Sequence, residues 1–203
     1  MSPRAKVQAG GILRKAADQT WRTPEFVLDH VRSYFGGQIP FDPATATSNP
    51  TKALRFCAGP EGTLFARDSL ESRSGLEVDW LEHGPWWVNP PFQRAWIEKI
   101  GREGEQGEGV ALLPCNRFEE PYLQSVLRVT SAICLVDAAP FQKGLKGNKH
   151  RIAFLSSLDG QACGANPFAS MILGFRTDAL AFVDAFGPLG LCIEPAVIER
   201  RGT

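Results

Sequence analysis

The sequence predicts a single α/β domain built on a doubly wound, mostly parallel β-sheet. Short apolar runs that suit buried strands alternate along the chain with longer segments of helical periodicity. Polar residues follow several of these strands directly, as expected where strands end at a ligand-binding edge. The chain has 203 residues, which is enough for one domain with a substantial core, and it shows no internal repeat.

The first half of the chain supplies a helix and the strands that lead to polar residues. Thr23 offers an N-cap, Pro24 suits the first helical position, and Gly36-Gly37 ends the helix. A short strand over 39–41 then leads to Asp42. The elements expected next are a helix over 49–57, a strand over 62–66 leading to Asp68, and a polar linker over 71–79.

The second half alternates in the same way. The apolar residues 85–88 suit a strand that ends at Asn89, and residues 93–100 continue as an amphipathic helix. A turn rich in Gly and Glu over 103–108 is expected after this helix. The remaining expected elements are strands over 110–113, 132–136, 152–155, 170–175 and 191–193, and helices over 119–129 and 178–186.

Asn89-Pro90-Pro91-Phe92 is the most informative motif, because it offers an amide, backbone carbonyls next to residues without an N–H donor, and an aromatic face. An amine attached to a flat ring is a weak nucleophile, since its lone pair is delocalised into the ring. The side-chain oxygen of Asn89 and the carbonyl of Pro90 can hold both N–H groups and favour a more tetrahedral nitrogen. Phe92 can stack on the ring. The same residues also suit a plain strand-to-helix turn.

Several motifs follow one another in an order that resembles a known family. Trp21-Arg22-Thr23-Pro24, Phe41-Asp42-Pro43-Ala44, Asp68-Ser69-Leu70, Trp80 and Asn89-Pro90-Pro91-Phe92 are similar to the ordered signature of phage-type (Dam-like) DNA N6-adenine methyltransferases. Residues 109–114, 150–154 and 166–170 resemble the later strands of that family, so the likeness spans residues 20–176. The Asn-Pro-Pro-aromatic motif also occurs in amino-methyltransferases that act on RNA or protein glutamine, and it therefore indicates the reaction better than the substrate.

The resemblance implies a Rossmann-like S-adenosylmethionine-dependent fold and a site-specific, adenine-specific DNA methyltransferase of phage or prophage origin. It implies catalytic roles for Asn89, Pro90, Pro91 and Phe92. The cofactor-binding residues that it implies are Trp21, Thr23, Pro24, Asp42, Ala44, Asp68 and Asn89. The alternatives are an enzyme of the same fold that methylates RNA or protein glutamine, and a catalytically silent DNA-binding phage protein.

Physical reasons support some of these roles, and plainer interpretations stand beside them. A carboxylate at position 42 suits the ammonium and sulfonium charges of the cofactor, and a small residue at position 44 leaves room for it. Asp42 also suits a turn before Pro43, Asp68 could cap a turn, and Thr23 could serve only as an N-cap. No Gly-x-Gly follows the first strand, so a glycine fingerprint does not identify cofactor contacts here.

The densest basic stretch, residues 141–151, is the candidate DNA contact. The expected DNA-binding residues are Lys143, Lys146, Lys149 and Arg151, with Arg117 from another strand end. A solvated loop is the plain alternative. We therefore expect a flexible basic arm over 1–20 and a methyltransferase domain over 21–203, with a small DNA-contacting segment over 137–151.

Composition limits the remaining choices. Lys plus Arg and Asp plus Glu number 22 each, so the chain lacks the global positive charge typical of many nucleic-acid binders. The five cysteines contain no Cys-x-x-Cys pair, and the three histidines lack the spacing of metal ligands, so we expect no metal. No stretch approaches the roughly 20 apolar residues that span a bilayer. We expect a cytoplasmic monomer or homodimer that does not bind membranes.

Overall fold

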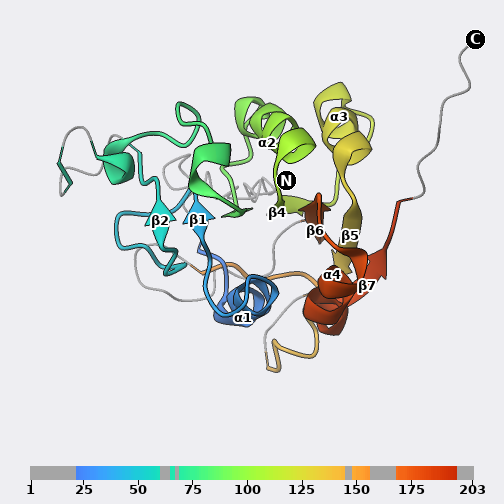
Figure 1. Ribbon diagram of the computed structural model, residues 1–203. Helices are drawn as coiled ribbons and strands as arrows, with labels where there is room; N and C mark the ends of the chain where they lie inside the picture. Colours follow the sequence, from blue (N-terminus) through green and yellow to red (C-terminus); the bar gives the residue numbers. More distant parts are fainter. Residues whose placement is uncertain (1–21, 60–64, 67–68, 145–147, 156–167, 196–203) are drawn as a thin grey trace, which may run out of the picture.

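The structure is a computed structural model that describes residues 22–59, 65–66, 69–144, 148–155 and 168–195. In this part of the chain the sheet has seven strands. They are β1 (Phe41–Asp42), β2 (Arg55–Phe56), β3 (Trp86–Val88), β4 (Gly109–Pro114), β5 (Ala132–Val136), β6 (Ser170–Phe175) and β7 (Gly190–Ile193). Their order in the sheet is β2-β1-β3-β4-β6-β5-β7 (Figure 1). The predicted roles of Trp21, Asp68 and Lys146 lie outside the described residues. The same is true of the arm over 1–20 and of most of the strand predicted over 62–66.

Most strands of the sheet run in one direction. Parallel pairing joins β2 to β1, β1 to β3 and β3 to β4, while β6 runs antiparallel between β4 and β5, and β7 runs antiparallel at the edge. The domain is therefore a mixed α/β domain with a mostly parallel sheet, as predicted.

Helices cover both faces of the sheet, because the strands are apolar on both sides. Helices α1 (Glu25–Tyr34) and α4 (Ala179–Phe186) pack on one face, and α2 (Arg94–Gln106) and α3 (Pro121–Val129) on the other (Figure 1). Alternate residues of β4 belong to the two cores, with Leu112 facing α1 and α4 and Leu113 facing α2 and α3. None of the helices in the described ranges is long and apolar enough to cross a membrane.

The strand order reverses between β1 and β3. The chain passes from β1 outward to β2 and then returns to form β3 on the other side of β1. In open α/β sheets, ligands bind outside the carboxyl ends of the strands at such a switch point. Asp42 is the last residue of β1 and Asn89 directly follows β3, so both border this point.

The helix predicted over 49–57 is wrong, because local side-chain contacts replace helical hydrogen bonds. Asn49 has a φ of 45°, its Oδ1 accepts from the Ala53 N–H at 3.1 Å, and its Nδ2 donates to the Ala53 carbonyl at 2.9 Å. The chain therefore turns and forms the short β2 strand instead. This turn brings Thr51, which the sequence did not single out, to the carboxylate of Asp42.

The turn predicted over 103–108 is also wrong, since α2 continues to Gln106. Lys99 and Glu103 form a buried ion pair one helical turn apart, with 2.6 Å between Nζ and Oε1, and the Lys99 ammonium lies 5.5 Å from the centre of the Trp80 ring. Gly104 packs against Phe175, where a Cβ atom would come within 2.3 Å of the ring. This glycine thus permits close packing between helix and sheet and does not end the helix.

Two further predictions need correction near the start of α1. Pro24, and not Thr23, is the N-cap residue, and no side chain caps the helix. The strand predicted over 152–155 is reduced to one antiparallel bridge, in which Arg22 and Leu155 exchange hydrogen bonds of 2.9 and 3.0 Å. The other predicted elements within the described ranges are present, with ends shifted by a few residues.

Candidate active site

Asp42 carries a buried carboxylate at the switch point. Its Oδ1 accepts from the Ala44 N–H at 3.0 Å and its Oδ2 from the Thr51 hydroxyl at 2.8 Å. Burial raises the pKa of Asp42 from 3.8 to about 6, although these hydrogen bonds act in the opposite direction. No cationic side chain in the described ranges forms an ion pair with Asp42, and no group of three or more His, Cys, Asp or Glu there could hold a metal ion. The carboxylate therefore suits a cationic group on a ligand.

Asn89 presents an oriented amide beside this carboxylate. It directly follows β3, whose residues are fully buried, and is itself half-buried. Its Nδ2 donates to the hydroxyl of Thr23, with 3.1 Å between Nδ2 and Oγ1. This contact engages the NH₂ end of the amide, and the side-chain oxygen is its acceptor end. Pro90, which follows, is buried, so the backbone of the motif is anchored as well.

A small cavity lies at the switch point, and we call it the switch-point cavity. Its volume is about 80 Å³. Four predicted cofactor-binding residues line it, namely Thr23, Asp42, Ala44 and Asn89, whereas Pro24 is buried at the start of α1 and is not among the lining residues. The other residues that line it are Arg22, Thr45, Ala46, Pro50, Thr51, Trp87 and Pro91.

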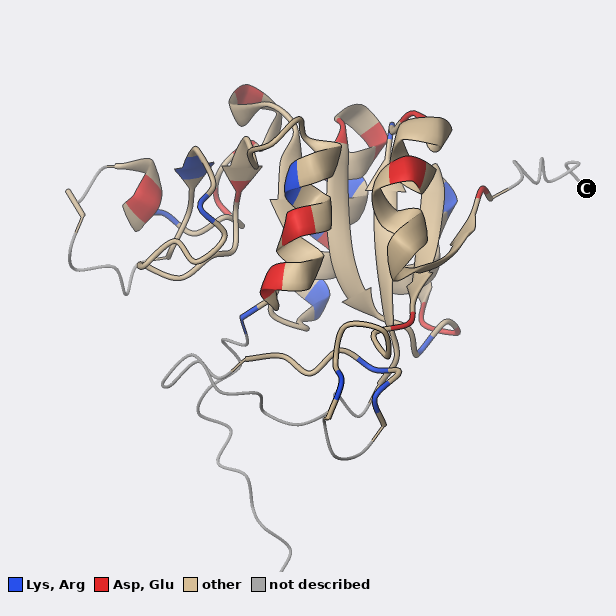
Figure 2. Cartoon of the chain, turned by 90° about the horizontal axis from the view of Figure 1, so that it is seen from below, with Lys and Arg blue, Asp and Glu red and all other residues tan. Residues whose placement is uncertain are grey.

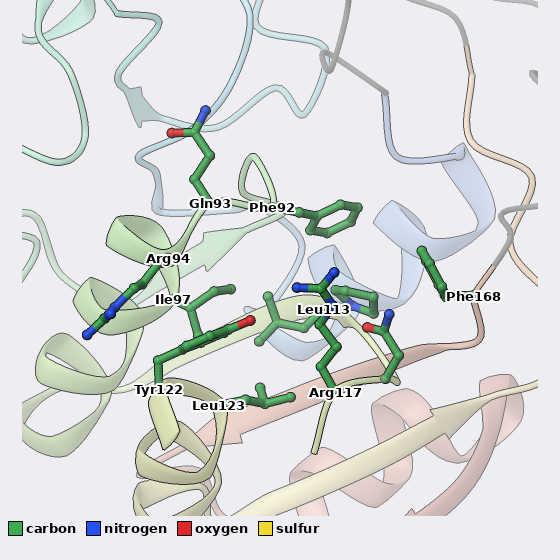
Figure 3. Close-up of a pocket in the computed structure, with 11 residues that line it drawn as sticks. Phe92, Gln93, Arg94, Ile97, Leu113, Arg117, Tyr122, Leu123 and Phe168 are labelled. Atoms are coloured by element: carbon green, nitrogen blue, oxygen red, sulfur yellow. The ribbon is translucent and has the colours of Figure 1, made fainter. Parts of the chain in front are cut away.

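A second cavity, the aromatic cavity, begins at Phe92 and has a volume of about 230 Å³. Figure 3 shows Tyr122 and Arg117 extending into the space next to Phe92, whereas Gln93 and Arg94 point away from it. Phe92 and Phe168 are 43% and 44% exposed, so both residues are accessible to a ligand. The other lining residues are Ile97, Leu113, Pro114, Asn116 and Leu123.

The Asn-Pro-Pro-Phe segment separates these two cavities. Asn89 and Pro91 line the switch-point cavity, and Phe92 lines the aromatic cavity. A flat ring against Phe92 would therefore lie next to the acceptors of the motif, with a cationic ligand on the other side. Of the predicted catalytic residues, the structure thus places Asn89, Pro91 and Phe92 at cavity walls and Pro90 in the buried backbone between them.

The predicted DNA-binding residues that the structure describes lie in two loops at the same edge of the sheet. Lys143, Lys149 and Arg151 belong to the segment after β5, whose described residues 137–144 and 148–155 we call the basic loop. Arg117 follows β4, has a φ of 56° and is exposed at the aromatic cavity. In Figure 2, blue segments gather on the loops at the lower edge of the view. Lys143 and Lys149 are exposed, and Arg151 is half-buried.

A buried glutamine holds the basic loop together. The Gln142 Nε2 donates to the carbonyls of Lys149 and Arg151 at 3.1 and 2.8 Å, and its Oε1 accepts from the Ala153 N–H at 2.7 Å. The ring of Phe141 stacks on Phe26 of α1 with 5.0 Å between ring centroids. The basic side chains are therefore carried by a backbone with defined anchors.

Sequence reasoning missed Gln142, Thr51 and the cavity residues Tyr122 and Asn116. Gln142 forms hydrogen bonds with backbone atoms several residues away, and no sequence motif indicates such contacts. Thr51 lay inside the segment that we expected to be helical. Phe168 also lines the aromatic cavity. It belongs to the segment 166–170, which resembles the family, and this resemblance was the only feature of the sequence that pointed to Phe168.

The fold and the two cavities together define an α/β protein with a two-part candidate site at the carboxyl edge of its sheet. Residues 11–181 match the DNA N-6-adenine-methyltransferase (Dam) family, and the chain belongs to this family. The resemblance seen in the sequence is thereby confirmed, and it identifies the protein as a DNA adenine methyltransferase with DNA as its substrate. No curated protein matches the chain.

Proposed function

We propose that the protein transfers a methyl group from S-adenosylmethionine to the N6 amine of adenine in DNA, within a Rossmann-like methyltransferase fold of phage or prophage origin. The observation that carries the proposal is the position of Asn89 to Phe92 between a cavity with a buried carboxylate and a cavity with aromatic walls. One cavity suits a cationic methyl donor and the other a flat base. Membership in the family supports adenine as that base.

The residues of the switch-point cavity fit S-adenosylmethionine. Its ammonium would supply the cation that the buried carboxylate of Asp42 lacks among its described neighbours. Thr23, Ala44 and Asn89 line the same cavity. Of the residues that the resemblance implied, we assign Asp42 and Ala44 to contacts with the cofactor, and we retain Trp21, Pro24 and Asp68 from the sequence. Thr23 and Asn89 border the same cavity, and their main role is toward the acceptor amine. When bound, the cofactor supplies a methyl group that its positively charged sulfur already activates.

The residues of the motif hold and orient the acceptor amine. The Asn89 side-chain oxygen and the Pro90 carbonyl accept the two N–H groups of the adenine amine, which favours a more tetrahedral, nucleophilic nitrogen. Phe92 stacks on the base, and Pro91 stiffens the segment between. Catalysis then rests on alignment and on exclusion of water, so no strong general base is needed. The proton of the methylated amine leaves through Asn89 or solvent.

The DNA must present an extruded adenine to the aromatic cavity, because the amine is inaccessible inside a stacked duplex. Lys143, Lys149 and Arg151 of the basic loop are exposed or half-buried at the same sheet edge, and Arg117 lies at the cavity itself. We assign these cations, with Lys146, to phosphate contacts near the flipped base. Such contacts position the DNA and do not read its sequence.

Nucleoside mass spectrometry tests the proposal. Unmethylated duplex DNA is incubated with the protein and S-adenosylmethionine, and with the Asn89→Ala variant as the control. New N6-methyladenine that is lost in the variant supports both the reaction and the site. If S-adenosylmethionine binds but only RNA, cytosine or protein glutamine becomes methylated, the acceptor assignment is wrong. If no acceptor is methylated while duplex DNA is still bound, the alternative of a catalytically silent DNA-binding protein is supported.

A further inference from the structure

Thr23 is held rigidly from both sides. Before it, Arg22 is fixed by its two hydrogen bonds with Leu155. After it, the carbonyl of Pro24 accepts from the N–H groups of Val27 and Leu28 at 3.0 and 3.2 Å and starts α1. The Thr23 side chain is buried, with 8% of the residue exposed. Its hydroxyl therefore occupies a defined position at the wall of the switch-point cavity.

The hydroxyl contacts the one amide whose orientation matters for the reaction. The Asn89 Nδ2 donates to Thr23 Oγ1 across 66 positions of sequence, so this contact depends on the fold and not on a local turn. The terminal torsion of an Asn side chain is broad and roughly two-fold, so an unrestrained amide can expose either its oxygen or its NH₂ group. An amine of the substrate needs an acceptor, and an NH₂ group facing it would place a donor against a donor.

We infer that Thr23 is a positioning residue that holds the Asn89 oxygen toward the acceptor amine, an inference that rests on the proposed function. The hydroxyl engages the NH₂ end of the amide and leaves the oxygen at the other end. The role differs from that of a cofactor ligand, which is the other function available to a hydroxyl at this wall. A cofactor ligand would be needed for binding of the cofactor, whereas a positioning residue is needed mainly for turnover.

Steady-state kinetics with Thr23→Val and Thr23→Ser separate these roles, because valine keeps the shape of threonine and serine keeps the hydroxyl. We expect Thr23→Val to lower kcat by about 10- to 100-fold. Its affinity for S-adenosylhomocysteine, measured by titration calorimetry, should stay within about twofold, and Thr23→Ser should restore most of kcat. A folded Thr23→Val variant with unchanged kcat overturns the inference, and so does a loss of S-adenosylhomocysteine affinity that accounts for the whole effect.

A second measurement does not depend on activity. In ¹⁵N NMR spectra, the side-chain NH₂ signals of Asn89 are identified by their loss in Asn89→Ala. They should move in Thr23→Val toward the positions of solvated amides and remain in place in Thr23→Ser. Unmoved signals in a folded Thr23→Val protein contradict the contact. If the contact is present but the wild-type protein methylates nothing, the proposed function fails and the positioning role fails with it, while an active Thr23→Val enzyme refutes the positioning role alone.

Discussion

The motif between the two cavities and the basic loop lie at the same edge of the sheet but are built differently. In the first region, side chains from separate elements hold one another, as Thr51 holds Asp42 and Thr23 holds Asn89. In the basic loop the charged groups are largely exposed, and the anchors are a buried glutamine that binds backbone atoms and the ring of Phe141 stacked on Phe26. Side chains that line the cavity are thus fixed in the first region. In the second region mainly the path of the chain is fixed, apart from an exposed contact of 3.0 Å between Asp137 and His150.

This difference matches the roles that we propose for the two regions. Methyl transfer requires reacting atoms that are aligned within a fraction of an ångström, whereas phosphate binding requires positive charge near a flexible, uniformly charged backbone. Substitutions in the two regions should therefore have different effects. Those at the motif should alter turnover or cofactor affinity, and those in the basic loop should alter the affinity for DNA and its dependence on salt.

Asn89→Ala should give the largest effect. Loss of the acceptor should lower kcat by about 100- to 1,000-fold, by analogy with removal of one preorganised hydrogen-bonding group from other active sites. Affinity for S-adenosylhomocysteine should remain, as checked by titration calorimetry. The matched control is Asn148→Ala, since Asn148 is an asparagine of the basic loop that accepts from the His150 N–H. Equal losses of kcat in the two variants would remove the distinction between the regions.

Asp42→Asn should affect cofactor binding more than any step after it. The substitution preserves shape but removes the charge that faces the ligand's ammonium, so affinity for S-adenosylhomocysteine should fall about 10- to 100-fold. Titration calorimetry measures the effect. Asp137→Asn, in the basic loop, is the control and should leave this affinity unchanged. A comparable loss in both variants would show that general electrostatics, and not the buried carboxylate, attracts the ligand.

The pH dependence of binding sharpens the same prediction. Burial raises the pKa of Asp42 to about 6, so the carboxyl is largely neutral at pH 5 and ionised at pH 7. Because the ionised form binds the ammonium, the affinity of the wild-type protein for S-adenosylhomocysteine should increase as the pH rises through about 6. The Asp42→Asn variant should show a nearly flat profile over this range. A flat wild-type profile would mean that Asp42 does not bind the ligand's ammonium.

The sequence predicted the parts of the molecule that depend on local pattern. The fully buried strand before Asn89 and the amphipathic helix after it could be recognised from apolar spacing, and so could the position of Asp42 at a strand end. The predicted helix over 49–57 failed because a single side chain, that of Asn49, satisfies the backbone in a turn. The spacing of apolar residues does not reveal a side chain that replaces the helical hydrogen bonds of the backbone.

The parts that the sequence could not supply are contacts between distant segments. The strand order places β6 between β4 and β5, and nothing in its apolar run specifies this position or its direction. The aromatic cavity likewise combines Phe92, Tyr122 and Phe168 from three separate segments. The candidate catalytic motif could therefore be predicted from the sequence, while the walls of the two cavities beside it could not.

Gln142→Leu should disturb the basic loop without altering the chemistry. The variant removes three hydrogen bonds to backbone groups, and unfolding in urea should show a loss of about 1–3 kcal/mol. The KM for DNA should rise several-fold at a nearly unchanged kcat. Gln124→Leu is the matched control, because Gln124 is an exposed glutamine of α3. A fall in kcat with no change in KM would show that the basic loop contributes to alignment of the base.

Paired substitution of Lys143 and Lys149 by Gln should have the smallest effect under physiological salt and the clearest signature when salt is varied. Each phosphate contact that is lost should reduce the slope of log affinity against log salt by about 0.9, so the pair should reduce it by about 1.8. Fluorescence anisotropy with duplex DNA measures this slope. Arg102→Gln with Arg128→Gln is the control, since these exposed arginines lie toward the ends of α2 and α3 that return to the opposite sheet edge. If both pairs change the slope equally, DNA binding is spread over the surface; if only the lysine pair does, phosphate binding belongs to the edge where the motif presents its acceptors.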